Sequence, residues 1–221
     1  MLCLVISYLR VPHPEILEAA TKKIQTPDTL SKVFWLYSLF TFIATAGFCS
    51  FILIAFHFKL QGVIADSRIP LLYAMAMGID ALAALSVGKM YDVLKSKHKN
   101  QSAGLNLLVI MPIISLLIPL LVFTNNIHYI VVGICLWGVV MGMHETIMRS
   151  AIADITSLEK RGTGYGFFNA TYGFAVLVGS SLLGFLYSRS IYFLAAAVII
   201  LESAAFVVFF FMKREIAKEI I

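Results

Sequence analysis

Six long apolar stretches, each ended by charged or strongly polar residues, constrain this 221-residue chain more than any other feature. A helix needs about 20 mostly apolar residues to cross a hydrocarbon core of about 30 Å. Each stretch meets that length, and none shows the apolar–polar alternation of a membrane β-barrel. The six predicted spans are residues 33–57, 69–91, 104–124, 127–148, 163–187 and 191–212. The sequence therefore predicts an all-α membrane protein with six transmembrane helices.

The composition excludes the other common classes of protein. Apolar residues make up 60% of the chain and charged residues 13%, with a mean hydropathy of +0.91. A soluble domain is nearer to half apolar and a quarter charged, and a disordered chain is more polar still. The three cysteines, Cys3, Cys49 and Cys135, lie far apart in apolar runs, which argues against a disulfide scaffold.

The ends of the chain are read as cytoplasmic. Residues 1–9 are apolar but too few to span, and they lack the charged start and cleavage site of a signal peptide. Prolines at 12 and 14 interrupt any helix, and residues 15–32 are polar with one apolar face. We expect 1–32 to be the stub of a preceding helix and a linker, 33–213 the bundle, and 214–221 a tail.

Orientation follows from the positions of the basic residues. An even number of spans places both termini on one side, and that side collects fourteen of the 17 lysines and arginines. The positive-inside rule predicts a multi-pass protein of the cell membrane with both termini in the cytoplasm. Because the charge is spread over four separate segments without clustered aromatic residues, nucleic acid is not an expected partner.

Ionisable residues at membrane depth need a function or a partner, since each costs at least about 2.5–3.5 kcal/mol at a helix centre. For Asp80 in the second span, a substrate or proton site and a structural hydrogen bond are equally supported. Glu145 and Arg149 lie four residues apart, so a structural ion pair is favoured over substrate contact. Glu202 in the sixth span is either protonated and packed or faces a partner helix.

The sequence shows no pattern typical of an enzyme or of a bound cofactor. His144 has no second histidine or cysteine at metal-ligand spacing, and no nucleophile–base constellation occurs within the spans. The glycines at 162, 164 and 166 follow no strand and precede no phosphate-loop lysine. We therefore expect no metal, no cofactor and no enzymatic activity.

Small residues and prolines predict how the spans pack and bend. Gly138 and Gly142 form a G-x-x-x-G pattern in the fourth span, and the fifth span is rich in glycine, which favours close helix contact. Pro112 and Pro119 are expected to bend the third span. Gly88 and Tyr91 recur as Gly184 and Tyr187, which is compatible with an inverted repeat of spans one to three and four to six, although chance explains a two-residue identity better when it is taken by itself.

Two cytoplasmic segments resemble motifs of the major facilitator superfamily. The sequence from Gly88 to Asp92, followed by a basic segment to Lys99, is similar to the Gly-x-x-x-Asp-basic motif of that family. Residues 142–154 and 160–169 look like the link between the tenth and eleventh helices of prokaryotic members. The chain departs from the motif where Val93 and Leu94 replace a basic residue. The resemblance implies the carboxy-terminal six-helix half of a twelve-helix transporter, with a 3+3 inverted repeat.

The resemblance also implies where functional residues lie. The first and fourth spans would line a central cavity, the second and fifth its sides, and the third and sixth would support them. The implied cavity candidates are Thr41, Thr45, Asp80, Trp137, Glu145, Asn169 and Tyr172. The implied gating or structural residues are Gly88, Lys89, Asp92, Arg149, Asp154, Arg161 and Gly162.

The implied function is movement of a small solute across the lipid bilayer by alternating access, passive or coupled to protons, with Asp80 as the functional charge. Such a half-transporter or truncated transporter would need a second six-helix bundle, either an amino-terminal half or another copy. The alternative is a non-transporting interaction or assembly protein derived from a transporter half.

Overall fold

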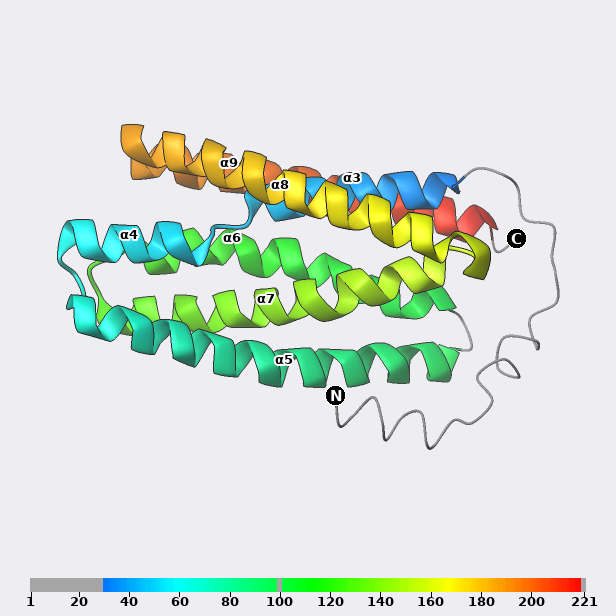
Figure 1. The fold of residues 1–221 in the computed structure, drawn as a ribbon, viewed down its shortest axis with the longest axis horizontal. Coiled ribbons are helices and arrows are strands. Elements are labelled where there is room, and N and C mark those ends of the chain that lie inside the picture. The colour runs from blue at the N-terminus through cyan, green and yellow to red at the C-terminus, as the bar shows by residue number, and fades with distance from the viewer. Residues whose placement is uncertain (1–29, 99–100, 220–221) are drawn as a thin grey trace.

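The computed structural model describes residues 30–98 and 101–219, and within these ranges all regular structure is helical. The longer elements run along one common direction, forming a bundle (Figure 1). They are α3 (Lys32–Gly47), α4 (Phe51–Gln61), α5 (Ile69–His98), α6 (Ile110–Val122), α7 (Ile127–Ile155), α8 (Arg161–Arg189) and α9 (Ile191–Glu219), with 3-10 turns η1 (Asp66–Arg68), η2 (Gln101–Val109) and η3 (Leu158–Lys160). The predicted fold class is confirmed.

Within residues 30–98 and 101–219, six helical segments are long and apolar enough to cross a membrane, as predicted. Their bounds are Lys32–Gln61, Asp66–Lys97, Gly104–Val122, Ile127–Ile155, Leu158–Arg189 and Ile191–Lys218, and they are called spans 1 to 6. The basic end of the bundle is where α3 and α8 begin and α5, α7 and α9 end, and the opposite end holds the turns after α4 and α8 (Figure 1). The segment 1–32, predicted to be a stub and a linker, lies mostly outside the described residues.

Span 1 is interrupted near its middle, which the sequence did not predict. Helix α3 ends at Gly47, Phe48 and Ser50 have extended backbone, and the Ser50 side chain caps α4 by accepting from the Leu53 N–H at 3.4 Å. Trp137 on α7 donates its indole N–H to the Cys49 carbonyl at 2.8 Å. The interruption therefore depends on a tertiary contact, and no proline in the sequence indicates it.

The two prolines of span 3 affect the hydrogen bonding of α6, one near its start and one near its end. Helix α6 begins at Ile110, directly after the nine-residue 3-10 segment η2. Pro112 lacks the N–H that an α-helix would direct to Leu108, so regular α-helical bonding cannot extend back through this point. Pro119 lies inside α6, and the Phe123 N–H closes the helix by bonding to its carbonyl at 3.3 Å.

Spans 1 to 3 and spans 4 to 6 contain equivalent helices that make equivalent contacts. Helix α7 of span 4 packs on α5 and α6 of spans 2 and 3, and in the same way α3 of span 1 packs on α8 and α9 of spans 5 and 6. The contact between α5 and η2 corresponds to the contact between α8 and α9. Helices α6 and α9, which are equivalent, contact each other. The constant shift that carries Tyr91 to Tyr187 also carries Ala46 to Gly142 and Ala83 to Gly179. These latter residues form two close helix contacts, one in each half, which supports the predicted inverted repeat.

The two equivalent contacts bring backbones together. A Cβ atom at Gly142 would lie 2.6 Å from the Asp80 carbonyl oxygen and 3.1 Å from Ala83 Cβ. A Cβ atom at Gly179 would lie 2.5 Å from both Cα and O of Ala46. Where lipid surrounds the helices, such close approach supplies dispersion contacts in place of a hydrophobic driving force.

Substitution of Gly179 by alanine is expected to destabilise the bundle, because the added methyl group meets backbone atoms that cannot rotate away. We expect a loss of about 1–3 kcal/mol in the free energy of unfolding. Gly173 on the same helix is the matched control, since nothing lies within 4 Å of its Cβ position. Thermal unfolding in detergent measures both variants, and equal melting temperatures would contradict the packing argument.

Candidate functional site

A cavity of about 590 Å³ opens beside the interruption of span 1. Four of the six spans contribute to its wall. The lining residues are Thr45, Phe48, Ser50, Phe51, Ile52 and Ala55 from span 1, Ile69, Pro70 and Tyr73 from α5, Trp137 and Met141 from α7, and Tyr172, Val176 and Ser180 from α8. Spans 3 and 6 contribute none of the lining residues. This division agrees with the expectation drawn from the resemblance.

The wall of the cavity is mainly aromatic and apolar, with a few hydroxyl groups. Phe51 contacts both Tyr73 and Trp137, with ring centroids 4.8 and 5.4 Å apart. Phe48 stacks on the other side of Trp137 at 5.5 Å. Among these rings, the hydroxyls of Ser50 and Ser180 offer hydrogen bonds. Such a surface suits an organic solute with an apolar body and a small number of polar groups.

The interruption of span 1 adds backbone polarity to this wall. The first N–H groups of a helix have no partner within the helix. At the start of α4, the Leu53 and Ile54 N–H groups bond to Ser50, whereas Phe51 and Ile52 come before them and line the cavity. An irregular backbone at membrane depth is tolerated where it is buried in protein or lines a water-filled space.

The ionisable candidates Asp80, Glu145 and Arg149 interact with one another or with Tyr172, which lines the cavity. Asp80 on α5 interacts electrostatically with Glu145 on α7, and Tyr172 interacts with both Glu145 and Arg149. Within the described part of the chain no ion pair joins Glu145 to Arg149, and both side chains are exposed. The favoured structural pair is therefore absent from this conformation, in which Glu145 interacts electrostatically with Asp80.

The remaining cavity candidates occupy different environments. Thr45, Trp137 and Tyr172 line the cavity. Thr41 is fully buried and lies outside its lining, and Asn169 is exposed on α8 outside the lining as well.

Sequence reasoning gave His144 no role in the cavity. Its buried ring packs between Phe48 and Tyr172, with centroids 5.0 and 6.1 Å away. No group of three or more potential metal ligands forms among the described residues.

At the basic end, Asp154 is the carboxylate that joins two helices. It accepts a hydrogen bond from the Tyr91 hydroxyl and another from the Lys95 ammonium, both at 2.6 Å, and so ties α7 to α5. Arg161 on α8 donates to the Ala153 carbonyl at 2.9 Å near the end of α7, where free carbonyls attract a cation. The sequence singled out Tyr91 only as part of the possible repeat, and it did not predict that Tyr91 and Lys95 bind Asp154.

The other motif residues lie on the surface of the bundle. Lys89, Asp92 and Gly162 are exposed, and no hydrogen bond or ion pair joins Asp92 to another described residue. Gly88 faces α7, where an added Cβ would lie 3.2 Å from the Thr146 methyl group. Among the described residues, therefore, Asp92 has no partner and Asp154 makes the internal contacts.

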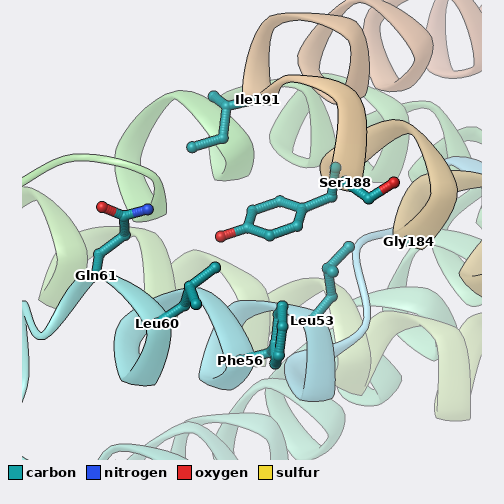
Figure 2. A pocket seen from close by; sticks show the side chains of 8 residues that line it. Leu53, Phe56, Leu60, Gln61, Gly184, Ser188 and Ile191 are labelled. Carbon is teal, nitrogen blue, oxygen red and sulfur yellow. The ribbon is translucent and has the colours of Figure 1, made fainter.

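A second pair of contacts mirrors the Tyr91–Asp154 bond at the opposite end. The Tyr187 hydroxyl and His57 Nδ1 lie 2.9 Å apart and join α8 to α4, and the shift that relates the repeats brings Tyr187 onto Tyr91. Figure 2 shows the pocket beside this contact, with Leu53, Phe56, Leu60 and Gln61 on one side and Gly184, Ser188 and Ile191 on the other. Each repeat thus uses its tyrosine to fasten one end of the bundle.

Replacement of Asp154 by asparagine should weaken the bundle while Asp92→Asn leaves it unchanged. Asparagine can still accept from Tyr91 but removes the charge that Lys95 faces, and the Asp154 side chain is only 9% exposed. We expect the free energy of unfolding to fall by about 1–3 kcal/mol for Asp154→Asn. Thermal unfolding compares the two variants. Similar losses in both would show that Asp154 has no special structural contribution.

Comparison with known proteins agrees with the resemblance. The model of the Major Facilitator Superfamily matches residues 103–220. Uncharacterized proteins of Mycobacterium bovis and Mycobacterium tuberculosis are 37% identical over 187 residues, which cover 82% of this chain and 44% of each relative. The chain therefore spans less than half the length of these relatives, and no solved structure matches it. With its six membrane-capable helices, the chain belongs to the major facilitator superfamily and has the form of one transporter half.

Proposed function

We propose that this six-helix bundle moves a small organic solute across a membrane by alternating access, together with a second six-helix bundle. The observation that carries the proposal is the cavity beside the interruption of span 1, lined by spans 1, 2, 4 and 5. In secondary transporters, binding sites lie near mid-membrane where repeats meet and helices are discontinuous. The aromatic wall and the Ser50 and Ser180 hydroxyls favour a solute that has an apolar body and a polar group.

The exposed apolar side chains of α5 and α8 support the proposal that a second bundle packs against these helices. Helices α5 and α8, which flank the cavity, are the least buried of the six spans. They leave large apolar side chains such as Leu82, Leu85, Phe174 and Leu177 exposed. In this proposal these helices face the second bundle, which is an amino-terminal half or another copy of the chain. Asp92, free at the basic end, is then available to the second bundle.

Asp80 is the proposed functional charge of the site. It lies on α5 beside Glu145, and one of its carboxylate oxygens is buried without a hydrogen-bond partner among the described residues. An ionisable group in this position is suited to bind a cationic group of the solute or a coupling proton.

We propose further that the basic end faces the cytoplasm. The described residues place ten lysines and arginines on the segments of the basic end, against Lys59, Arg68 and Arg189 at the opposite end. This asymmetry is the one that the positive-inside rule relates to cytoplasmic loops of the cell membrane.

Labelling of single cysteines tests this orientation in a variant that lacks Cys3, Cys49 and Cys135. Cysteines placed at Gln61 and Asn126 should react with a membrane-impermeant maleimide added outside cells, and one at Ser157 should react only after the membrane is opened. The reason is that Gln61 and Asn126 lie at the opposite end and Ser157 at the basic end. The reverse labelling pattern would overturn the orientation.

Uptake by the chain reconstituted as a pair with a second six-helix bundle tests the transport proposal. A library of small organic solutes is first screened for those that raise the melting temperature, since ligand binding stabilises the folded state. Uptake of such a solute should be lost in Ser180→Trp, which fills the cavity, and retained in Ile200→Trp, a matched substitution on the exposed face of α9. Asp80→Asn should abolish concentrative uptake without changing stability.

Two results would contradict these expectations. Solute flux through demonstrably monomeric protein would show that one bundle suffices, against the alternating-access argument. Normal uptake by Ser180→Trp would remove this cavity from the pathway. Stable pairing with another membrane protein, without uptake of any stabilising solute, would favour the alternative of an interaction or assembly protein.

A further inference from the structure

A carboxyl group with no partner lies inside the bundle, away from the residues proposed for transport. Glu202 is in the middle of α9, on span 6, and its side chain is fully buried. Neither carboxyl oxygen has a hydrogen-bond partner among the described residues. The Ser115 hydroxyl on α6 interacts with Glu202 but does not meet hydrogen-bond geometry. Such a group in the interior needs a specific explanation.

The carboxyl group lies against the point where span 1 leaves the helix. Gly47 is the last residue of α3, and a Cβ atom placed there would be 3.0 Å from Glu202 Oε1 and 3.1 Å from Leu201 Cβ. A Cβ atom at this position would require Glu202 or Leu201 to shift by a few tenths of an ångström, so glycine favours the close approach of α9. The next residues, Phe48 and Ser50, line the transport cavity. Glu202 is therefore separated from the cavity by the interrupted segment of span 1.

Among the described residues, no positive charge faces Glu202 from the helices that pack against α9, since Lys32 at the start of α3 pairs with Glu215 near the end of α9. Helix α6 and the segment η2 contain no ionisable residue, and the part of α8 beside Ala46 contains none either. From span 1, the Cys49 thiol is the ionisable group that interacts electrostatically with Glu202. An ionised Glu202 would therefore be a buried negative charge without a countercharge, which is strongly unfavourable.

We propose that Glu202 is a proton-binding site that controls the interruption of span 1. In the conformation described here the carboxyl group holds a proton and packs against Gly47. When the O–H bond breaks, the electron pair stays on the carboxyl oxygen and the proton passes to water. The carboxylate then requires hydration, which reaches it most directly if the segment from Phe48 to Ser50 moves aside and admits water from the cavity.

This site differs from the one proposed for the solute. Asp80 lies on α5 beside Glu145, whereas Glu202 lies on α9 behind span 1 and does not line the cavity. The inference concerns protonation and local conformation and does not require that the chain transport anything. Its test therefore uses the full chain in detergent, without a solute or a second bundle.

Infrared spectroscopy detects the proton directly. A protonated carboxylic acid has a C=O stretching band that shifts in D₂O, and we expect this band in the wild-type protein at neutral pH. The band should be lost in Glu202→Gln, which keeps the size and shape of the side chain, and be retained in Asp80→Asn. A spectrum in which Glu202→Gln keeps the full band would overturn the proposal.

Fluorescence of Trp137 reports the coupling to span 1, because its indole donates to the Cys49 carbonyl and stacks on Phe48. In a Trp35→Phe background, Trp137 is the remaining tryptophan. Its emission should shift to longer wavelength as the pH is raised, since water enters the interruption. The shift should be lost in Glu202→Gln, and a transition of the same size and midpoint in that variant would refute control by Glu202.

A chemical measurement keeps the test independent of how well the variant folds. Dicyclohexylcarbodiimide reacts with protonated carboxyl groups in apolar surroundings, and mass spectrometry locates the adduct in the wild-type chain. We expect modification at Glu202, with a yield that falls as the pH is raised, and little modification at the exposed Glu145. Absence of an adduct at Glu202 at low pH would refute the proton-binding site.

Discussion

The hydrogen bond from the Trp137 indole to the Cys49 carbonyl allows span 1 to leave helical geometry inside a bilayer. In hydrocarbon, a backbone group without a partner costs several kcal/mol, so an open turn survives only where protein groups satisfy it. Trp137 supplies that partner at 2.8 Å, and the Ser50 side chain supplies another at the start of α4. The cavity beside this turn and the approach of Glu202 to Gly47 both depend on the interruption.

The inverted repeat explains why related contacts join the helices at both ends of the bundle. The repeats share the close contacts at Gly142 and Gly179, which set the spacing of the helices. They also share a tyrosine, but each tyrosine has acquired a different partner: Asp154 for Tyr91 and His57 for Tyr187. The two repeats thus share their close helix contacts, while the polar partners of their tyrosines differ between the two ends of the bundle.

Helix α5 and helix α8 connect these contacts with the proposed function. Each has one face held by a small-residue contact and a tyrosine, and another face that carries exposed apolar side chains. A rigid bundle with two such faces can rock as a unit against a second bundle, which is what alternating access requires. The Asp154 network joins helices within the bundle, so the proposed rocking motion would leave it intact.

The six spans and the basic asymmetry could be read from the amino-acid order, because length, hydropathy and charge act locally along each segment. The G-x-x-x-G pattern likewise announced a close contact. The interruption at Phe48 to Ser50 could not be predicted, because no proline marks it and its partner Trp137 lies far along the chain. The same reason hid the pairing of Asp154 with Tyr91 and the position of Glu202 against Gly47. Each of these depends on which helices become neighbours, and that is decided only when all six pack together.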